Sequence, residues 1–137
     1  MKTKKIIILL MLFVAILGFT MTTVTSADAA SKTVGIKSHP NYGTSKYIGK
    51  GDYAFTYYNK KYSAQAGKSR YLSISIVNNN YYPYTKYYKM TKTKVYFKTT
   101  AGKILVKNYK ANKYGSVSKV VPKSMNPYKA IVYYKKK

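Results

Sequence analysis

The chain has 137 residues, of which 26 are Lys or Arg and only two are Asp or Glu, for a net charge of +24. It contains no cysteine, which excludes disulfides, thiolate metal sites and a lipoprotein-type anchoring cysteine. So strong a positive charge indicates that the protein acts on polyanions.

The first 30 residues have the pattern of a secretory signal peptide. Three lysines within the first five residues form a positive start, and residues 6–19 form an uncharged apolar run. Ala27 and Ala29 then flank a small-x-small cleavage site. The apolar run is short for a bilayer span of about 20 residues, so we predict export with cleavage after Ala29 or Ala30.

Removal of residues 1–30 leaves 107 residues, the size of one domain. The removed segment holds three basic residues and one acid, so 23 basic residues remain against Asp52 alone, a net charge of +22. An exported domain without cysteine is typical of a Gram-positive bacterium. The chain closes on lysines without an apolar sorting tail, so we expect a secreted protein retained non-covalently on the cell envelope.

Composition also bears on whether this domain folds. Leu, Ile, Val and Phe make up only about 17% of the mature chain, a share associated with disorder at this net charge. All 18 tyrosines lie there as well, and a tyrosine can bury its ring while its hydroxyl stays hydrated. Tyrosines double the material for a core, so we predict a folded domain.

The first predicted elements are strands. Residues 31–50 contain Gly, Ser, Asn and Pro with few large apolar residues, so we expect a loosely ordered N-terminal arm with at most one short strand near residues 34–36. The domain proper is expected over residues 51–137 and begins with an aromatic strand over residues 52–58. Over residues 72–77, apolar residues alternate with serines, which predicts a strand buried on one face.

A tyrosine-rich stretch follows this strand. Residues 78–80 are three asparagines, which favour a turn. Residues 81–89 then hold five tyrosines and two lysines around Pro83. Because proline cannot donate to a central ladder, we predict an edge or a connection between sheets, in which parity turns Tyr84 and Tyr88 inward.

The remaining patterns complete the predicted fold. Residues 94–98 and 103–107 alternate as the two strands of a hairpin around a turn at residues 99–102. A short strand is predicted over residues 117–121 and a last one over residues 128–134. No segment has a sustained helical period, so the mature chain is predicted to be all-β, a small antiparallel β-sandwich or barrel.

Few side chains of this protein could take part in catalysis. The mature protein has one histidine, His39, and one carboxylate, Asp52, so it lacks a carboxylate pair for glycoside hydrolysis and ligands for a zinc site. No nucleophile motif supports a His39–Asp52–Ser triad. We therefore predict no enzymatic activity, no cofactor, no metal and no small-molecule substrate, with His39 in a loop and Asp52 in a turn.

Lysines interleaved with tyrosines suit two kinds of polyanion. Single-stranded nucleic acid is one, but export and the single arginine, Arg70, argue against it as a physiological partner. Anionic wall polymers such as teichoic acid, or the anionic membrane surface, are the partners we expect. The candidate contacts are Lys60, Lys61, Tyr81, Lys86, Tyr87, Lys89, Lys92, Lys94, Lys135, Lys136 and Lys137.

Two stretches resemble the lactococcin 972 family of small secreted bacteriocins. Residues 75–80, SIVNNN, are similar to a family strand that ends in a Val-Asn-Asn-Asn turn, and residues 129–134, KAIVYY, to its aromatic closing strand. Residues 51–63 match its N-terminal segment loosely, and the tryptophans of the family pattern do not occur here. The resemblance implies a β-sandwich that interferes with wall synthesis at the envelope of a target cell.

Three functions thus stay open. The first is a non-catalytic binder of anionic envelope polymers or membrane surface, and the second is a bacteriocin-like antagonist of related bacteria. The third is a structural surface-layer or matrix component whose edge strands pair between chains, against which the terminal lysines argue. The first two functions share the same surface chemistry, so composition does not distinguish between them. Composition does not determine the oligomeric state either.

Overall fold

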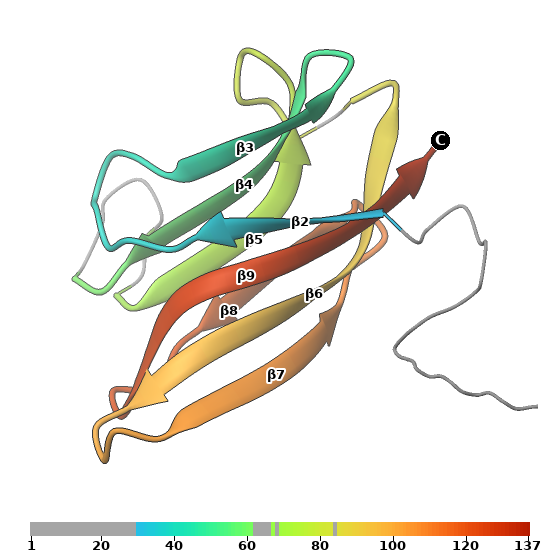
Figure 1. Ribbon diagram of the computed structural model, residues 1–137. Coiled ribbons are helices and arrows are strands. Elements are labelled where there is room, and N and C mark those ends of the chain that lie inside the picture. The colour runs from blue at the N-terminus through green and yellow to red at the C-terminus, as the bar shows by residue number, and fades with distance from the viewer. Residues whose placement is uncertain (1–29, 62–66, 68, 84) are drawn as a thin grey trace, which may run out of the picture.

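The computed structural model describes residues 30–61, 67, 69–83 and 85–137 (Figure 1). All but the last residue of the predicted signal peptide lies outside this part, as does Tyr84, so both predictions stay predictions. The described chain forms eight antiparallel strands in two four-stranded sheets and contains no helix. The all-β prediction is confirmed, and the architecture is a two-layer sandwich and not a closed barrel.

The two sheets differ in strand order. We call the sheet with order β2-β9-β6-β7 sheet I and the sheet with order β3-β4-β5-β8 sheet II. The strands of sheet I are β2 (Ala30–Gly35), β6 (Tyr88–Thr99), β7 (Ile104–Lys110) and β9 (Met125–Lys136). Those of sheet II are β3 (Thr44–Gly49), β4 (Asp52–Asn59), β5 (Tyr71–Val77) and β8 (Ser116–Val120).

The patterned segments form the strands that the sequence predicts. β5 buries Leu72, Ile74 and Ile76 on its inner face, as the alternation with serine indicates. β6 and β7 form the expected hairpin, and the stretch around Pro83 lies between β5 of sheet II and β6 of sheet I, as predicted for a connection between sheets. The asparagine turn also forms, because Asn78 Oδ1 accepts hydrogen bonds from the backbone after it.

Residues 31–50 do not form the loose arm that the sequence indicates. They contribute β2 and β3, which pair with β9 and β4 along their lengths. Val34 and Ile36 are buried in the core and hold this segment in place. Both strands lie at sheet edges, where few side chains need to be buried. Their low apolar content therefore gives no clear strand pattern in the sequence. Among the described residues, the strands of the domain therefore begin with β2 and not at residue 51.

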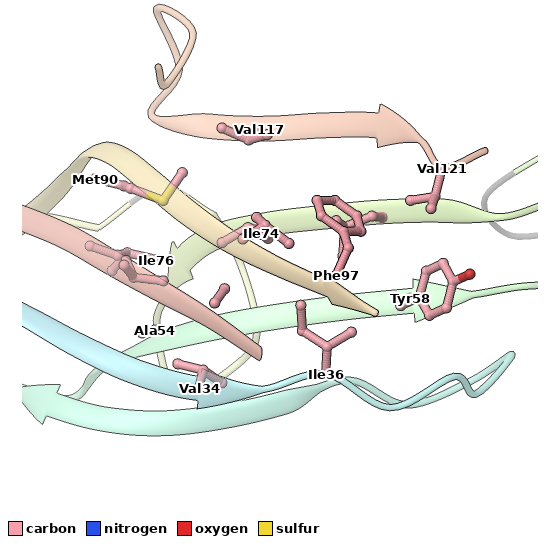
Figure 2. Close-up of a cluster of buried hydrophobic side chains, with 14 of the residues drawn as sticks. Val34, Ile36, Ala54, Tyr58, Ile74, Ile76, Met90, Phe97, Val117 and Val121 are labelled. Carbon is pink, nitrogen blue, oxygen red and sulfur yellow. The ribbon is translucent and has the colours of Figure 1, made fainter. Parts of the chain in front are cut away.

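The core lies between the two sheets and is mainly aliphatic (Figure 2). Phe97 is its largest fully buried side chain, and Tyr58 is the one tyrosine of the described residues that is buried with it. Tyr88, Tyr109 and Tyr134 are partly buried and pack against its rim. Tyrosine thus fills less of the core than composition predicts, and many of the rings lie on outer surfaces.

Tyr58 offers a test of this packing. Its hydroxyl is buried and has no hydrogen-bond partner in the described part of the chain. Burial raises the pKa of Tyr58 above 10.0, although the Arg70 charge lowers it. Since the folded pKa exceeds the unfolded one, the stability that the neutral phenol contributes is present below pH 10 and is lost as the pH rises past the folded value.

We expect Tyr58→Phe to leave the free energy of unfolding unchanged, or to raise it by about 1 kcal/mol, at neutral pH. Above pH 10 the variant should lose less stability than the wild type, because the group that ionises there is gone. Urea unfolding at both pH values measures this, with the exposed Tyr114→Phe as control. A loss of more than about 1 kcal/mol at neutral pH would mean that the hydroxyl has a partner.

Candidate functional site: a cationic face on sheet I

The outward side of sheet I gathers lysines from three strands. Along β6, buried Val95 and Phe97 alternate with residues that point away from the core, and the pairing register extends this parity to β7 and β9. The outward lysines, which we call the cationic face, are Lys89, Lys92, Lys94, Lys98, Lys110, Lys129 and Lys135.

Like charges stand directly across from each other on this face. Lys89 pairs with Lys135 across β6 and β9, and Lys92 pairs with Lys110 across β6 and β7. The one acidic residue in the described part of the chain, Asp52, belongs to sheet II. Like charges directly opposite each other destabilise a sheet by a few tenths of a kcal/mol to about 1 kcal/mol. The face therefore carries a local cost that a bound anion would remove.

Tyrosines on the same face contact two of the lysines. The Nζ atom of Lys92 lies 5.0 Å from the ring centroid of Tyr133, and that of Lys129 lies 4.6 Å from the centroid of Tyr96. Tyr128 packs edge-on against Tyr96, with centroids 6.2 Å apart. Cation–π contacts at exposed sites contribute about 0.5–1 kcal/mol each and restrict the lysine chain. The face thus presents positioned cations beside aromatic rings.

The outward side of sheet II has a different chemistry. No outward position of its four described strands carries a lysine or arginine. Aromatic residues and serines occupy this side, among them Tyr53, Phe55, Ser73 and Ser118. The two lysines of these strands, Lys46 and Lys119, are exposed but stand at the opposite parity on the edge strands. The separation therefore concerns the two outward faces, and it favours a role for the cationic face.

A second group of lysines lies at the end of the sandwich where β9 stops. Lys50, Lys86, Tyr87, Lys136 and Lys137 line a cavity of about 170 Å³ there. The backbone N–H of Lys137 donates to Tyr87 O at 2.9 Å, and its ammonium group donates to the carbonyl of Thr85. These contacts tie the C-terminus to the connection between β5 and β6.

The structure places the predicted contact residues in four locations. Lys89, Lys92, Lys94 and Lys135 share the cationic face, and Lys86, Tyr87, Lys136 and Lys137 lie together at the adjoining end. Tyr81 lies instead on the side of sheet II, where its ring centroid is 5.8 Å from that of Phe55. Lys60 and Lys61 follow the last residue of β4, at the far end from Lys50.

Four lysines of these two groups are not among the contact residues that the sequence predicts. Lys98 continues the β6 alternation and could have been found by extending it past Lys94. Lys110 and Lys129 join the face only through strand pairing, and Lys50 reaches the end of the sandwich through the turn between β3 and β4. No local pattern marks these three.

His39 and Asp52 do not form a dyad. The N–H of His39 donates to Tyr58 O at 2.8 Å, near the end of β4, whereas Asp52 begins that strand, about 20 Å away along it. His39 Nδ1 accepts hydrogen bonds from the N–H groups of Asn41 and Tyr42, as in a loop. Asp52 lies in a strand and is buried, and not in a turn as the sequence indicates.

The described residues contain no group of three or more His, Cys, Asp or Glu side chains that could hold a metal ion. Within the same residues, no helix has the length and apolar character needed to cross a bilayer.

Comparison with protein-family models, with curated proteins and with solved structures finds no match to this chain. The resemblance of residues 75–80 and 129–134 to the lactococcin 972 family therefore stays a prediction.

Proposed function

We propose that the protein is a secreted, non-catalytic binder of anionic polymers of the cell envelope, such as teichoic acid, or of the anionic membrane surface. The observation that carries the proposal is the confinement of outward lysines to sheet I, where like charges oppose one another and no acid neutralises them. An anionic polymer laid along this face would relieve the repulsion and gain contacts with several lysines at once.

The strength of such binding comes from the number of contacts. A lysine near an anionic surface contributes on the order of 1 kcal/mol, so the seven lysines of the cationic face suffice without a deep pocket. Tyr96, Tyr128 and Tyr133 add rings that are apolar at the body and polar at the tip, which favours an interface between polymer and water. Charge contacts of this kind are screened by salt.

The test uses cell walls from a Gram-positive bacterium, with and without their anionic polymer. We expect the secreted protein to bind intact walls and to be released as salt is raised, because screening weakens each contact. Walls stripped of teichoic acid should retain at least tenfold less protein. Equal retention on both kinds of wall would contradict the polymer proposal, and parallel binding to anionic vesicles would then identify the membrane surface as the partner.

A further inference from the structure

A cavity of about 400 Å³ lies at the same end of the sandwich as the second lysine group. Three segments that are distant in the sequence form its walls: the turn between β3 and β4, the asparagine turn at residues 78–80 and the connection at residues 85–87. Its polar lining combines Asp52 with Lys50, Lys86 and the three asparagines.

Asp52 is the unusual member of this lining. It is the only carboxylate side chain that the predicted mature chain has, and it is 2% exposed. Its Oδ2 atom is buried and finds no hydrogen-bond donor among the described residues, the neighbouring lysines included. A buried carboxylate oxygen without a donor costs free energy, so a ligand that brought a donor to Asp52 would remove this cost.

The walls around Asp52 are held in fixed conformations. Gly49, Lys50 and Gly51 all have positive φ, at 126°, 57° and 80°. For Lys50 this conformation costs about 1 kcal/mol, and strain of this kind is often retained where a site needs it. A Cβ atom at Gly51 would lie 3.4 Å from Asn79 Nδ2, an ordinary van der Waals contact, so the Asn79 side chain lies beside the glycine. The cavity therefore exists before a ligand binds.

We propose that this cavity binds a group that carries an ammonium and a phosphate a few bonds apart. The negative charge of the Asp52 carboxylate attracts the ammonium, while Lys50 and Lys86 bind the phosphate and the asparagine amides bind its remaining oxygens. The inference rests on the proposed function, because it names the chemical group of an envelope phosphate that would bind in this cavity. Such a group occurs as an amino substituent on a phosphate polymer or as a lipid headgroup.

The test compares two small probes on the secreted protein: O-phosphoethanolamine, which has both groups, and glycerol phosphate, which lacks the ammonium. We expect O-phosphoethanolamine to bind about tenfold more tightly, as measured by NMR titration, with the largest shifts around Asp52. Asp52→Asn, which keeps the shape of the side chain, should abolish this preference. Lys86→Gln should weaken both probes about equally.

Several outcomes would overturn the inference. Equal affinity for the two probes would do so, as would an Asp52→Asn variant that folds by circular dichroism and keeps the preference. If Asp52→Asn fails to fold, the inference is tested by comparing the affinities of the two probes for the wild type and for Lys86→Gln. Binding of Asp52→Asn to walls stripped of amino substituents should equal that of the wild type, which separates this inference from the proposed function.

Two competition experiments distinguish a lipid headgroup from a wall polymer as the source of the group. Vesicles containing phosphatidylethanolamine should compete with O-phosphoethanolamine if the ligand is a headgroup. An aminated phosphate polymer, but not its deaminated form, should compete if the ligand belongs to the wall. Competition by neither would contradict a physiological role for the cavity.

Discussion

Replacing Arg70 with alanine should lower the free energy of unfolding by about 3 kcal/mol, measured by urea denaturation. The Arg70 guanidinium donates to three backbone carbonyls: Nε to Val121 O at 3.0 Å, and Nη2 to Pro122 O at 3.0 Å and to Met125 O at 2.7 Å. The Arg70 carbonyl in turn accepts from Val121 N–H at 2.8 Å.

Arg70 holds the two sheets together at one end of the sandwich. It directly precedes β5 of sheet II, and the carbonyls that it binds lie where the chain passes from β8 to β9 of sheet I. A positive φ of 55° places the residue in a strained conformation that the surrounding hydrogen bonds offset. Truncation would leave partly buried carbonyls without donors at the point where the chain crosses between sheets.

Two controls sharpen this expectation. Arg70→Lys keeps the charge but not the planar fork, so it should recover less than half of the lost stability. Lys123→Ala removes an exposed cation from the same crossing and should change stability by less than about 0.5 kcal/mol. A loss below about 1 kcal/mol for Arg70→Ala would show that water replaces the guanidinium without penalty.

The second large effect concerns the cationic face. Lys94→Gln combined with Lys98→Gln should weaken binding to teichoic-acid-bearing walls about 30-fold, since each lysine contributes on the order of 1 kcal/mol near an anionic surface. Both residues point outward from β6 and have exposed or half-exposed side chains. Wall-binding isotherms at one fixed salt concentration measure the change, because screening alters every contact.

The matched control removes the same charge elsewhere. Lys60→Gln combined with Lys61→Gln lies beyond the last residue of β4, off the cationic face, and should weaken binding less than about threefold. Equal effects of the two pairs would mean that net charge alone drives binding. Thermal unfolding should show no loss of stability for the variant at Lys94 and Lys98, because removing like charges from one face relieves repulsion.

How much of the fold was predictable varies with the kind of strand. The alternation of residues 72–77 identified β5 and its buried face, because a strand that covers a core repeats every two residues. The hairpin of β6 and β7 was equally evident, although its first strand begins earlier, at Tyr88. The sequence predicted at most one short strand where β2 and β3 lie, since edge strands bury few side chains and leave a weak pattern.

The candidate site was predictable only in part. Lys92 and Lys94 share one face by parity within a single strand, which sequence alone can show. Lys89 and Lys135, far apart in the chain, become neighbours only because β9 pairs with β6. Tyr81 was grouped with the lysines on the basis of local sequence, yet its positive φ of 62° goes with a ring that lies beside Phe55 on sheet II.

The sequence by itself determined the all-β class, the excess of cations and the scarcity of catalytic side chains, because these follow from composition and short-range periodicity. Only the tertiary structure decided that the outward lysines occupy one sheet and leave the outward face of the other without a lysine, and that Asp52 is buried in a cavity wall. The reason is physical: parity assigns a side chain to one of two faces, but long-range pairing and packing decide which face becomes the core and which strands stand beside each other.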